Sequence, residues 1–170
     1  RPLAVALPET HEQVGAVLAA CHALQVPVVA RGAGTGLSGG ALPHVMGVTL
    51  SLAKLNRIVR IDPLARTAVV ECGVRNLAIS EAAAQHGLYY APDPSSQIAC
   101  SIGGNVAENA GGVHCLKYGL TVHNVLRVRG FTIEGEVLEL GSEALDSPGL
   151  DLLAAFIGSE GLLGVATEIT

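Results

Sequence analysis

Two glycine-rich segments are the parts of this chain best suited to hold a ligand through the backbone. The first, Arg31–Gly40 (RGAGTGLSGG), directly follows an apolar run, and the second spans residues 101–112 (SIGGNVAENAGG). Because glycine lacks a β-carbon, the backbone N–H groups of such segments can approach a ligand closely and converge on it. Such concave groups of N–H donors suit phosphate oxygens. Two of them in one chain of 170 residues indicate a long, dinucleotide-sized ligand with several points of contact.

The first segment also matches two enzyme motifs by letter, but the context of each motif is missing. Gly34–Gly39 reads G-x-G-x-x-G, yet a Rossmann NAD site needs a helix directly afterwards, and Pro43 and Gly47 follow instead. Gly36–Gly40 reads G-x-S-x-G, and a hydrolase nucleophile elbow needs the same absent helix. The sequence G-K-[ST] of a P-loop does not occur. A phosphate cradle is therefore favoured over a nicotinamide-dependent dehydrogenase or a hydrolase.

Histidines and cysteines do not form a catalytic or metal-binding pattern. The four cysteines include no C-x-x-C pair, which disfavours a zinc site or a disulfide scaffold and favours a reducing compartment. The adjacent His114 and Cys115 would rarely supply two ligands to one tetrahedral metal ion. Arg31 is equally compatible with a phosphate contact and with a solvated loop. Asn105 and Asn109 can cap a helix or adopt a left-handed backbone, and both roles are compatible with a ligand contact.

The composition is that of a folded domain that does not seek anionic partners. Apolar residues make up 49% and charged residues 15%, which predicts a real core rather than disorder. The net charge of −5 disfavours nucleic acid or an anionic membrane as partner, although backbone dipoles can still hold an anionic cofactor. We find no secretory leader and no 18-residue apolar stretch, so we expect no transmembrane segment and a cytoplasmic protein. Both ends of the chain are abrupt, and we expect it to be a piece of a longer polypeptide.

The first third of the chain must position the first glycine segment, and its pattern is parallel α/β. Leu3–Leu7 is predicted to be a short buried strand. Thr10–Gln13 is a capping box that opens an amphipathic helix, and Val28–Ala30 is the next strand. This β-α-β order predicts a parallel pair with a right-handed crossover. Val45–Leu52 is predicted to be a third strand.

The remainder predicts an antiparallel sheet with helices. Turn residues at 62–66 and 134–136 mark two hairpins, and Gly87 marks the end of a helix. The expected strands are Arg57–Ile61, Thr67–Cys72, Val125–Ile133, Val137–Leu140 and Leu163–Thr170, and the expected helices are Arg75–His86 and Asp151–Ile157. The predicted fold class is therefore α+β. A small parallel β-α-β subdomain (residues 1–57) precedes a larger, mainly antiparallel sheet flanked by helices (residues 58–170).

Four segments together resemble, in order and spacing, the FAD-binding domain of the vanillyl-alcohol oxidase/p-cresol methylhydroxylase superfamily. The branch that they resemble most is that of glycolate oxidase D subunits and FAD-linked D-lactate dehydrogenases. Any one segment alone is a weak signal, but the four cover nearly the whole chain. They are Pro27–Gly40, Pro92–Ser96, Ser101–Gly112 with His114–Gly119, and Gly158–Val165.

The resemblance implies a set of cofactor-binding residues. Around the FAD pyrophosphate it places Gly32, Ala33, Gly34, Thr35, Gly36, Leu37 and Ser38, with Arg31 in reach of a phosphate. Along the ribityl and pyrophosphate region it places Pro92, Asp93, Ser96, Ser101, Ile102, Gly103 and Gly104. Asn105, Asn109 and Gly112 would continue that wall toward the isoalloxazine, and Gly164 and Val165 would meet the adenine end.

The same resemblance implies the activity and its division between domains. It implies oxidation of a 2-hydroxy acid, similar to glycolate or D-lactate, to a 2-oxo acid by hydride transfer to FAD. Some relatives bind the flavin covalently through a histidine in the first glycine segment, which has none here, so we expect non-covalent FAD. The family places substrate recognition, metal ligands and the catalytic base on a cap domain, which we expect outside this chain. We therefore name no catalytic residue and no metal site, and we expect the fragment to be inactive alone.

The sequence leaves the partners and one alternative function open. The candidate partners are the hydroxy acid, other oxidase subunits and an electron acceptor. The alternative function is a non-catalytic module that carries flavin for electron transfer or assembly.

Overall fold

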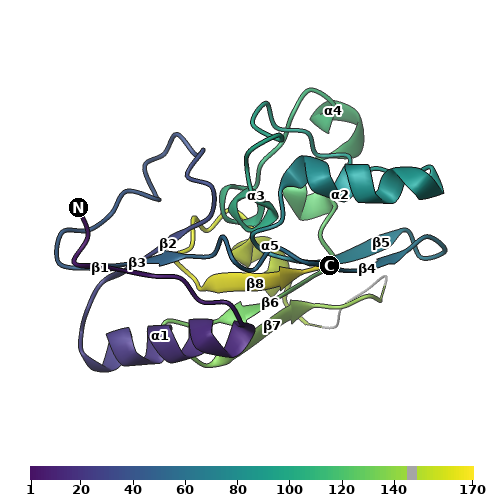
Figure 1. The fold of residues 1–170 in the computed structure, drawn as a ribbon. Helices are drawn as coiled ribbons and strands as arrows, with labels where there is room; N and C mark the ends of the chain where they lie inside the picture. The colour runs from purple at the N-terminus through teal and green to yellow at the C-terminus, as the bar shows by residue number, and fades with distance from the viewer. Residues whose placement is uncertain (145–148) are drawn as a thin grey trace.

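Two sheets of different type form the framework of the computed structural model, which describes residues 1–144 and 149–170 (Figure 1). The smaller sheet is parallel, with strand order β1-β3-β2, and the larger is antiparallel, with order β4-β5-β8-β6-β7. The strands are β1 (Ala4–Ala6), β2 (Val28–Arg31), β3 (Val48–Ser51), β4 (Ile58–Asp62), β5 (Thr67–Glu71), β6 (Arg127–Phe131), β7 (Val137–Gly141) and β8 (Val165–Ile169). The predicted α+β class, with a small parallel part and a larger antiparallel part, is confirmed.

The pairing expected within the small sheet is wrong in one respect. β1 and β2 are parallel but not adjacent, because β3 lies between them and Thr49 pairs with both Val5 and Val29. The central place goes to the strand that buries most: Leu50 is fully buried and Thr49 is 6% exposed. The spacing of elements along the chain does not show which strand becomes central, because that depends on which strand the rest of the fold buries.

The prediction that β1 is buried is also wrong. Leu3, Val5 and Leu7 are 63%, 55% and 56% exposed. Successive side chains of a strand point to opposite faces, and β1 is an edge strand whose Ala6 packs toward the core. Helix α1 (His11–Ala23) lies against one face of this sheet (Figure 1). The exposed Leu3, Val5 and Leu7 are not covered by it.

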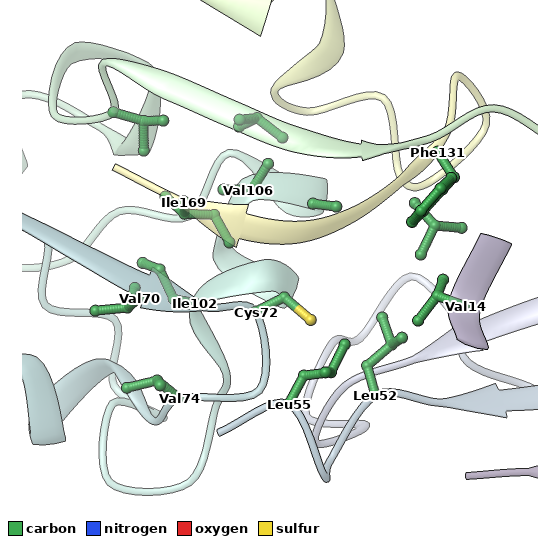
Figure 2. Close-up of a cluster of buried hydrophobic side chains, with 14 of the residues drawn as sticks. Val14, Leu52, Leu55, Val70, Cys72, Val74, Ile102, Val106, Phe131 and Ile169 are labelled. Atoms are coloured by element: carbon green, nitrogen blue, oxygen red, sulfur yellow. The ribbon is translucent and has the colours of Figure 1, made fainter. Parts of the chain in front are cut away.

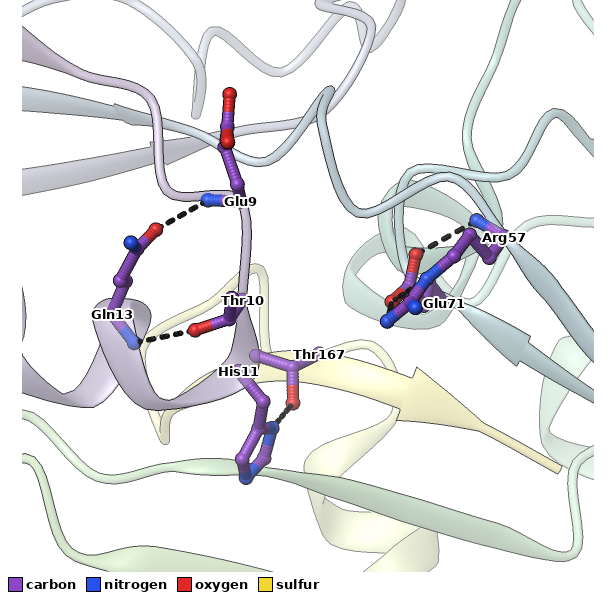
Figure 3. Close-up of polar contacts among 7 residues, drawn as sticks. All are labelled: Glu9, Thr10, His11, Gln13, Arg57, Glu71 and Thr167. Carbon is purple, nitrogen blue, oxygen red and sulfur yellow. Dashed lines mark hydrogen bonds and ion pairs between the residues drawn. The ribbon is translucent and has the colours of Figure 1, made fainter.

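Helix α1 begins as the sequence predicts. Thr10 is the N-cap, and its hydroxyl oxygen accepts a hydrogen bond from the Gln13 N–H at 3.3 Å. The Gln13 side chain accepts in return from the N–H of Glu9 at 2.7 Å, one residue before the position of an ideal capping box (Figure 3). Val14 and Leu18 then bury one face of the helix completely.

The second glycine-rich segment is largely helical, which corrects its expected description as a loop. It contains α3 (Ile102–Glu108), which Ser101 caps at its start and Asn109 ends with a left-handed φ of 49°. Two glycines disfavour a helix, but Ile102 (1% exposed) and Val106 (0%) bury its inner face, and tertiary packing decides (Figure 2). The expected role of Asn109 as a helix cap is confirmed, whereas that expected of Asn105 is wrong, because Asn105 lies inside α3 with a negative φ.

The remaining helices are short. α2 (Asn76–Ala83) continues into the 3₁₀ turn η1 (Ala84–His86), and Gly87 ends it with a φ of 67°, as predicted. The expected helix near residues 151–157 is α5 (Leu152–Phe156), capped by the Asp151 carboxylate. Two further short elements, α4 (Cys115–Tyr118) and η2 (Thr121–His123), were not expected. Across the described residues, no helix is long and apolar enough to cross a bilayer.

The link between the two sheets is fixed by contacts at the end of β5. The Gly73 N–H donates to the Leu55 carbonyl at 2.7 Å, and a β-carbon on Gly73 would lie only 2.6 Å from the Leu52 carbonyl oxygen. Beside it, the Glu71 carboxylate, 7% exposed as a residue, accepts three hydrogen bonds from Arg57 (Figure 3). They come from the backbone N–H, Nε and Nη2, at 2.7, 3.0 and 2.7 Å. The segment that leaves the small sheet is therefore held against the large one.

His11 joins the start of α1 to the large sheet. The Thr167 hydroxyl donates to the Arg129 carbonyl at 3.1 Å, so its oxygen accepts from His11 Nδ1 at 2.5 Å (Figure 3). Nε2 is buried without a partner among the described residues, and the ring packs against Phe131 with centroids 4.3 Å apart. Burial first, and the charge of Arg129 second, lower the pKa of His11. The neutral ring is the form that fits.

This arrangement predicts a stability that falls in mild acid. The folded-state pKa of His11 lies below its ordinary value of 6.5, so the unfolded chain binds the proton first as the pH falls. The contribution of neutral His11 to the free energy of unfolding is fully present above pH 6.5. It is lost as the pH falls from there toward the folded-state pKa. Between pH 7.5 and 5, urea unfolding should show that the free energy of unfolding falls less in His11→Gln than in the parent. The exposed-histidine control His86→Gln should follow the parent, and equal pH slopes for His11→Gln and the parent would contradict the assignment.

Candidate functional site

A cleft of about 620 Å³ lies between the two sheets. Its walls come from three parts of the chain: the first glycine segment after β2, the segment 94–110 that includes α3, and the stretch from α5 to the start of β8. Leu52 and Cys72 contribute from the link between the sheets. The volume is in the range of cofactor sites, about 300–1,000 Å³. It is large enough for the dinucleotide-sized ligand that the sequence predicts.

The structure brings most of the predicted site residues to this cleft. Its lining includes Arg31, Gly32, Ala33, Gly34, Thr35, Gly36, Leu37, Ser96, Ser101, Gly103, Gly104, Asn105, Gly164 and Val165. Six predicted residues are not part of the lining and lie behind or beside it. They are Ser38, Pro92, Asp93, Ile102, Asn109 and Gly112.

Several lining residues were not named from the sequence. Glu108 and Glu160 lie inside two of the segments that resemble the family, Ser101–Gly112 and Gly158–Val165. The segments could have indicated both residues, although neither is a characteristic residue of its motif. Cys72 has no local signal, because it enters the cleft only through the packing of β5 under α3.

The first glycine segment leaves its amides free. Within the described part of the chain, no backbone N–H of residues 32–41 donates a hydrogen bond. Gly34 has a φ of 72°, a left-handed conformation that residues with a β-carbon rarely adopt. Unpaired N–H groups are costly unless water or a ligand accepts from them. The segment is therefore chemically suited to an anionic ligand held by the backbone.

The cleft walls come close together at two glycines, Gly32 and Gly103. A β-carbon on Gly32 would overlap the Ser101 hydroxyl, which itself caps α3 by accepting from the Gly104 N–H at 3.4 Å. A β-carbon on Gly103 would lie 2.8 Å from the β-carbon of Cys72, and the Gly103 N–H donates to the Cys72 carbonyl at 2.8 Å. The first glycine segment, α3 and the end of β5 thus approach one another through their backbones.

A buried amide pair supports the segment 92–96, of which residues 94–96 line the cleft. Asn76 Nδ2 donates to the Pro92 carbonyl at 3.0 Å and to Asn105 Oδ1 at 2.8 Å. Asn105 Nδ2 donates to Cys100 Sγ at 3.3 Å. Asn76 and Asn105 are 1% and 3% exposed, so their amides are committed to the fold. Asn105 lines the cleft while its side chain fixes the neighbouring segment.

A second polar pair fixes the same segment from outside the cleft. The Asp93 carboxylate contacts His114 twice, with Oδ2 to Nδ1 at 2.6 Å and Oδ1 accepting from the backbone N–H at 3.2 Å. The hydrogen bond from the His114 ring is the main reason why the pKa of Asp93 is lowered. A β-carbon on Gly112 would overlap the Asp93 carbonyl. Among the described residues, no three histidine, cysteine or acidic side chains gather as a metal site.

Charge in the cleft is sparse. Its lining contains one cationic residue, Arg31, and two acidic ones, Glu108 and Glu160. Nη2 of Arg31 lies 2.8 Å from the place of a β-carbon on Gly34, so the guanidinium folds back against its own segment. Burial, followed by the nearby Glu71 charge, raises the pKa of Cys72 to about 12. The Cys72 thiol therefore stays protonated at neutral pH and is not a nucleophile.

Comparison with known proteins gives the same assignment for fold and cofactor. A family model described as "FAD binding domain" matches residues 2–141. Glycolate oxidase subunit GlcD of Escherichia coli (strain K12) is 70% identical over 170 residues, which are 100% of this chain and 34% of that protein. D-lactate dehydrogenase of Archaeoglobus fulgidus is 38% identical over 167 residues, 98% of this chain and 37% of that protein. The chain thus spans about a third of the length of these relatives.

A solved structure shares the fold at lower identity. Alkyldihydroxyacetonephosphate synthase superposes with a TM-score of 0.84 at 26% identity, covering 97% of this chain and 32% of the other.

The contact between Gly32 and Ser101 predicts a non-additive pair of substitutions. Gly32→Ala should lower the free energy of unfolding by about 1–3 kcal/mol, because the new methyl group overlaps the Ser101 hydroxyl. Ser101→Ala alone should cost about 1 kcal/mol through loss of the helix cap. In the double variant the overlap is gone, so its loss should be smaller than the sum of the two.

The matched control for this measurement is Gly40→Ala, since nothing lies within 4 Å of a β-carbon on Gly40. Urea unfolding of the four variants decides the point. Additive losses, or equal losses for Gly32→Ala and Gly40→Ala, would show that the two segments do not approach as closely as described.

Proposed function

This chain belongs to the family of FAD-binding domains, and from that premise we propose that it is the FAD-binding part of an enzyme that oxidises a 2-hydroxy acid. The proposed reaction converts an acid such as glycolate or D-lactate to the 2-oxo acid. Relatives named glycolate oxidase subunit and D-lactate dehydrogenase support this substrate class. The observation that carries the cofactor assignment is a cleft lined by residues 32–37, 40 and 41, whose backbone N–H groups have no partner in the described structure, together with the start of α3.

The residues present fit the cofactor. The pyrophosphate would lie along the amides of residues 32–38, where a side chain on Gly34 would be strained and Arg31 adds one positive charge. We place the ribityl region along residues 94–96 and 101–104, and the adenine end near Gly164 and Val165. The wall continues through Asn105 toward residues 109–112, where we place the isoalloxazine. Asp93, through His114, and Asn109 and Gly112 act by shaping that wall.

The work of these residues is binding and orientation. When bound, the flavin supplies the acceptor for the hydride that leaves C2 of the substrate. The backbone amides stabilise phosphate charge without a cationic surface, which agrees with a net charge of −5. Apolar lining residues such as Leu52, Val106 and Phe156 exclude water from the same space.

We assign the rest of the reaction to a longer protein. Residues 1–57 and 58–170 are proposed as the two subdomains of the FAD-binding unit. The substrate site, catalytic base and any metal ligands would lie in a cap domain outside it. Other oxidase subunits are the proposed partners, because one relative is named a subunit. We also propose a cytoplasmic location.

The first test is cofactor binding by the chain itself. Purified protein mixed with FAD should keep the visible flavin absorbance after desalting, whereas NAD should not bind. We expect the flavin to be non-covalent, because residues 31–40 contain no histidine and the Cys72 thiol is protonated. Acid precipitation should therefore leave the yellow colour in the supernatant. Colour in the pellet with a mass increase on a peptide of the protein would contradict the non-covalent assignment, and binding of NAD without FAD would contradict the proposed function.

The backbone at Gly34 gives a sharper test of the pyrophosphate cradle. Gly34→Val places a β-branched side chain at a φ of 72°, a strain of about 1–3 kcal/mol, and pushes it against Arg31. We expect the Kd for FAD to rise about tenfold to a hundredfold.

Gly87→Val is the matched control. Gly87 has a similar φ of 67° and no atom within 4 Å of its β-carbon position, and it lies outside the cleft lining. Unfolding followed by circular dichroism should show a comparable loss of stability in both variants. Gly87→Val should nevertheless bind FAD like the parent. If Gly34→Val also binds like the parent, the first glycine segment does not hold the pyrophosphate.

A further inference from the structure

The first glycine segment has almost no attachment of its own. Residues 32–38 make no backbone hydrogen bond within the described structure, and a single side-chain bond ties them to the rest of it. In that bond the Ser38 hydroxyl donates to Glu108 Oε2 at 3.0 Å. A segment so rich in glycine has many alternative conformations, so one well-placed bond has a large effect on its order.

Glu108 is well placed to order the segment. It is the last residue of α3, whose residues Ile102 and Val106 are 1% and 0% exposed and anchor the helix in the core. Its second oxygen, Oε1, lies 3.0 Å from the position of a β-carbon on Gly36. One carboxylate therefore bonds to Ser38 and lies beside Gly36, and it also lines the cleft.

The negative charge of Glu108 is unfavourable for a cofactor that carries phosphates. A carboxylate beside a site for phosphates repels them, so its charge by itself opposes binding of the cofactor. Arg31, the one cation in the lining, has no hydrogen bond to Glu108 among the bonds of the described residues. A function for Glu108 at this place must come from its contact with the glycine segment rather than from its charge.

We propose that Ser38 and Glu108 form a clasp that holds the first glycine segment in its binding shape before the cofactor arrives. Glu108 is then a positioning residue, and the proposal rests on the FAD site proposed above. An ordered segment does not have to lose its conformational freedom on binding, and affinity rises accordingly. The clasp acts through a hydrogen bond, which a neutral acceptor can also provide.

Three substitutions separate the bond from the charge. Ser38→Ala removes the donor, Glu108→Ala removes the acceptor and the charge, and Glu108→Gln removes the charge but keeps an acceptor oxygen. Titration of each purified variant with FAD, followed by quenching of flavin fluorescence, gives the Kd. We expect Ser38→Ala to bind FAD about three- to tenfold more weakly than the parent. Glu108→Ala and the double variant Ser38→Ala/Glu108→Ala should have nearly the same Kd, because the hydrogen bond is already absent from Glu108→Ala. Glu108→Gln should bind as tightly as the parent or more tightly.

Glu136→Ala controls for net charge, because Glu136 is an exposed carboxylate in the β6–β7 turn, outside the cleft lining. It should bind FAD like the parent. Parent-like binding by both Ser38→Ala and Glu108→Ala would overturn the clasp. Tighter binding by Glu108→Ala than by Glu108→Gln would also overturn it, since the carboxylate would then act only by repulsion.

A readout without FAD keeps this test separate from the proposed function. Leu37 is fully exposed in the segment, so chymotrypsin can report its order in the free protein. Cleavage after Leu37 should be several times faster in Glu108→Ala than in the parent, and unchanged in Glu108→Gln. Equal cleavage rates in Glu108→Ala and the parent would contradict the clasp. Failure of the parent to bind FAD would contradict the proposed function alone.

Discussion

The close approach of three backbone segments is the constraint on which the cleft depends. The first glycine segment, the start of α3 and the end of β5 come together at Gly32 and Gly103, where a β-carbon would meet the Ser101 hydroxyl or the Cys72 side chain. Gly73 allows a third approach, between the end of β5 and the link from the small sheet. Each approach is possible because glycine has no β-carbon, and together the three approaches fix how the segments that form the cleft walls lie against one another.

This constraint also explains how an acidic protein can hold an anionic cofactor. The approach brings a run of unpaired amides to one side of the cleft, and these supply partial positive charge without lysine or arginine. Support comes from polar contacts behind the lining: the buried Asn76–Asn105 pair and the more exposed Asp93–His114 pair both fix the segment 92–96. The walls are held by the core, while the glycine segment itself is held by few bonds, so rigidity and adaptability lie in different parts of one site.

The sequence predicted the parts of this structure that local chemistry decides. Thr10 begins α1, Gly87 ends the second helix, and the Asp62 carboxylate accepts from the N–H groups of Leu64 and Ala65 in the first hairpin turn. In each case the residues that make the element are neighbours in the chain. The glycine motifs likewise predicted a part of the cleft lining, because the freedom of their backbone amides is a local property.

What the sequence could not show depends on partners distant in the chain. β3 lies between β1 and β2, and one face of β1 stays open, because the placement of α1 decides which face is covered. The helical state of residues 102–108 comes from burial of Ile102 and Val106, which overrides the two glycines. Cys72 in the cleft and the bond from Ser38 to Glu108 are tertiary contacts, and no motif contains them.

The central claim is that the amides of the first glycine segment hold the pyrophosphate of FAD. An amide-resolved nuclear magnetic resonance titration of the protein with FAD tests it most directly. The account predicts large, saturating downfield shifts of the amide protons of residues 32–38, while those of the hairpin turn at 134–136 stay unchanged. Saturation by FAD without shifts in residues 32–38 would contradict it.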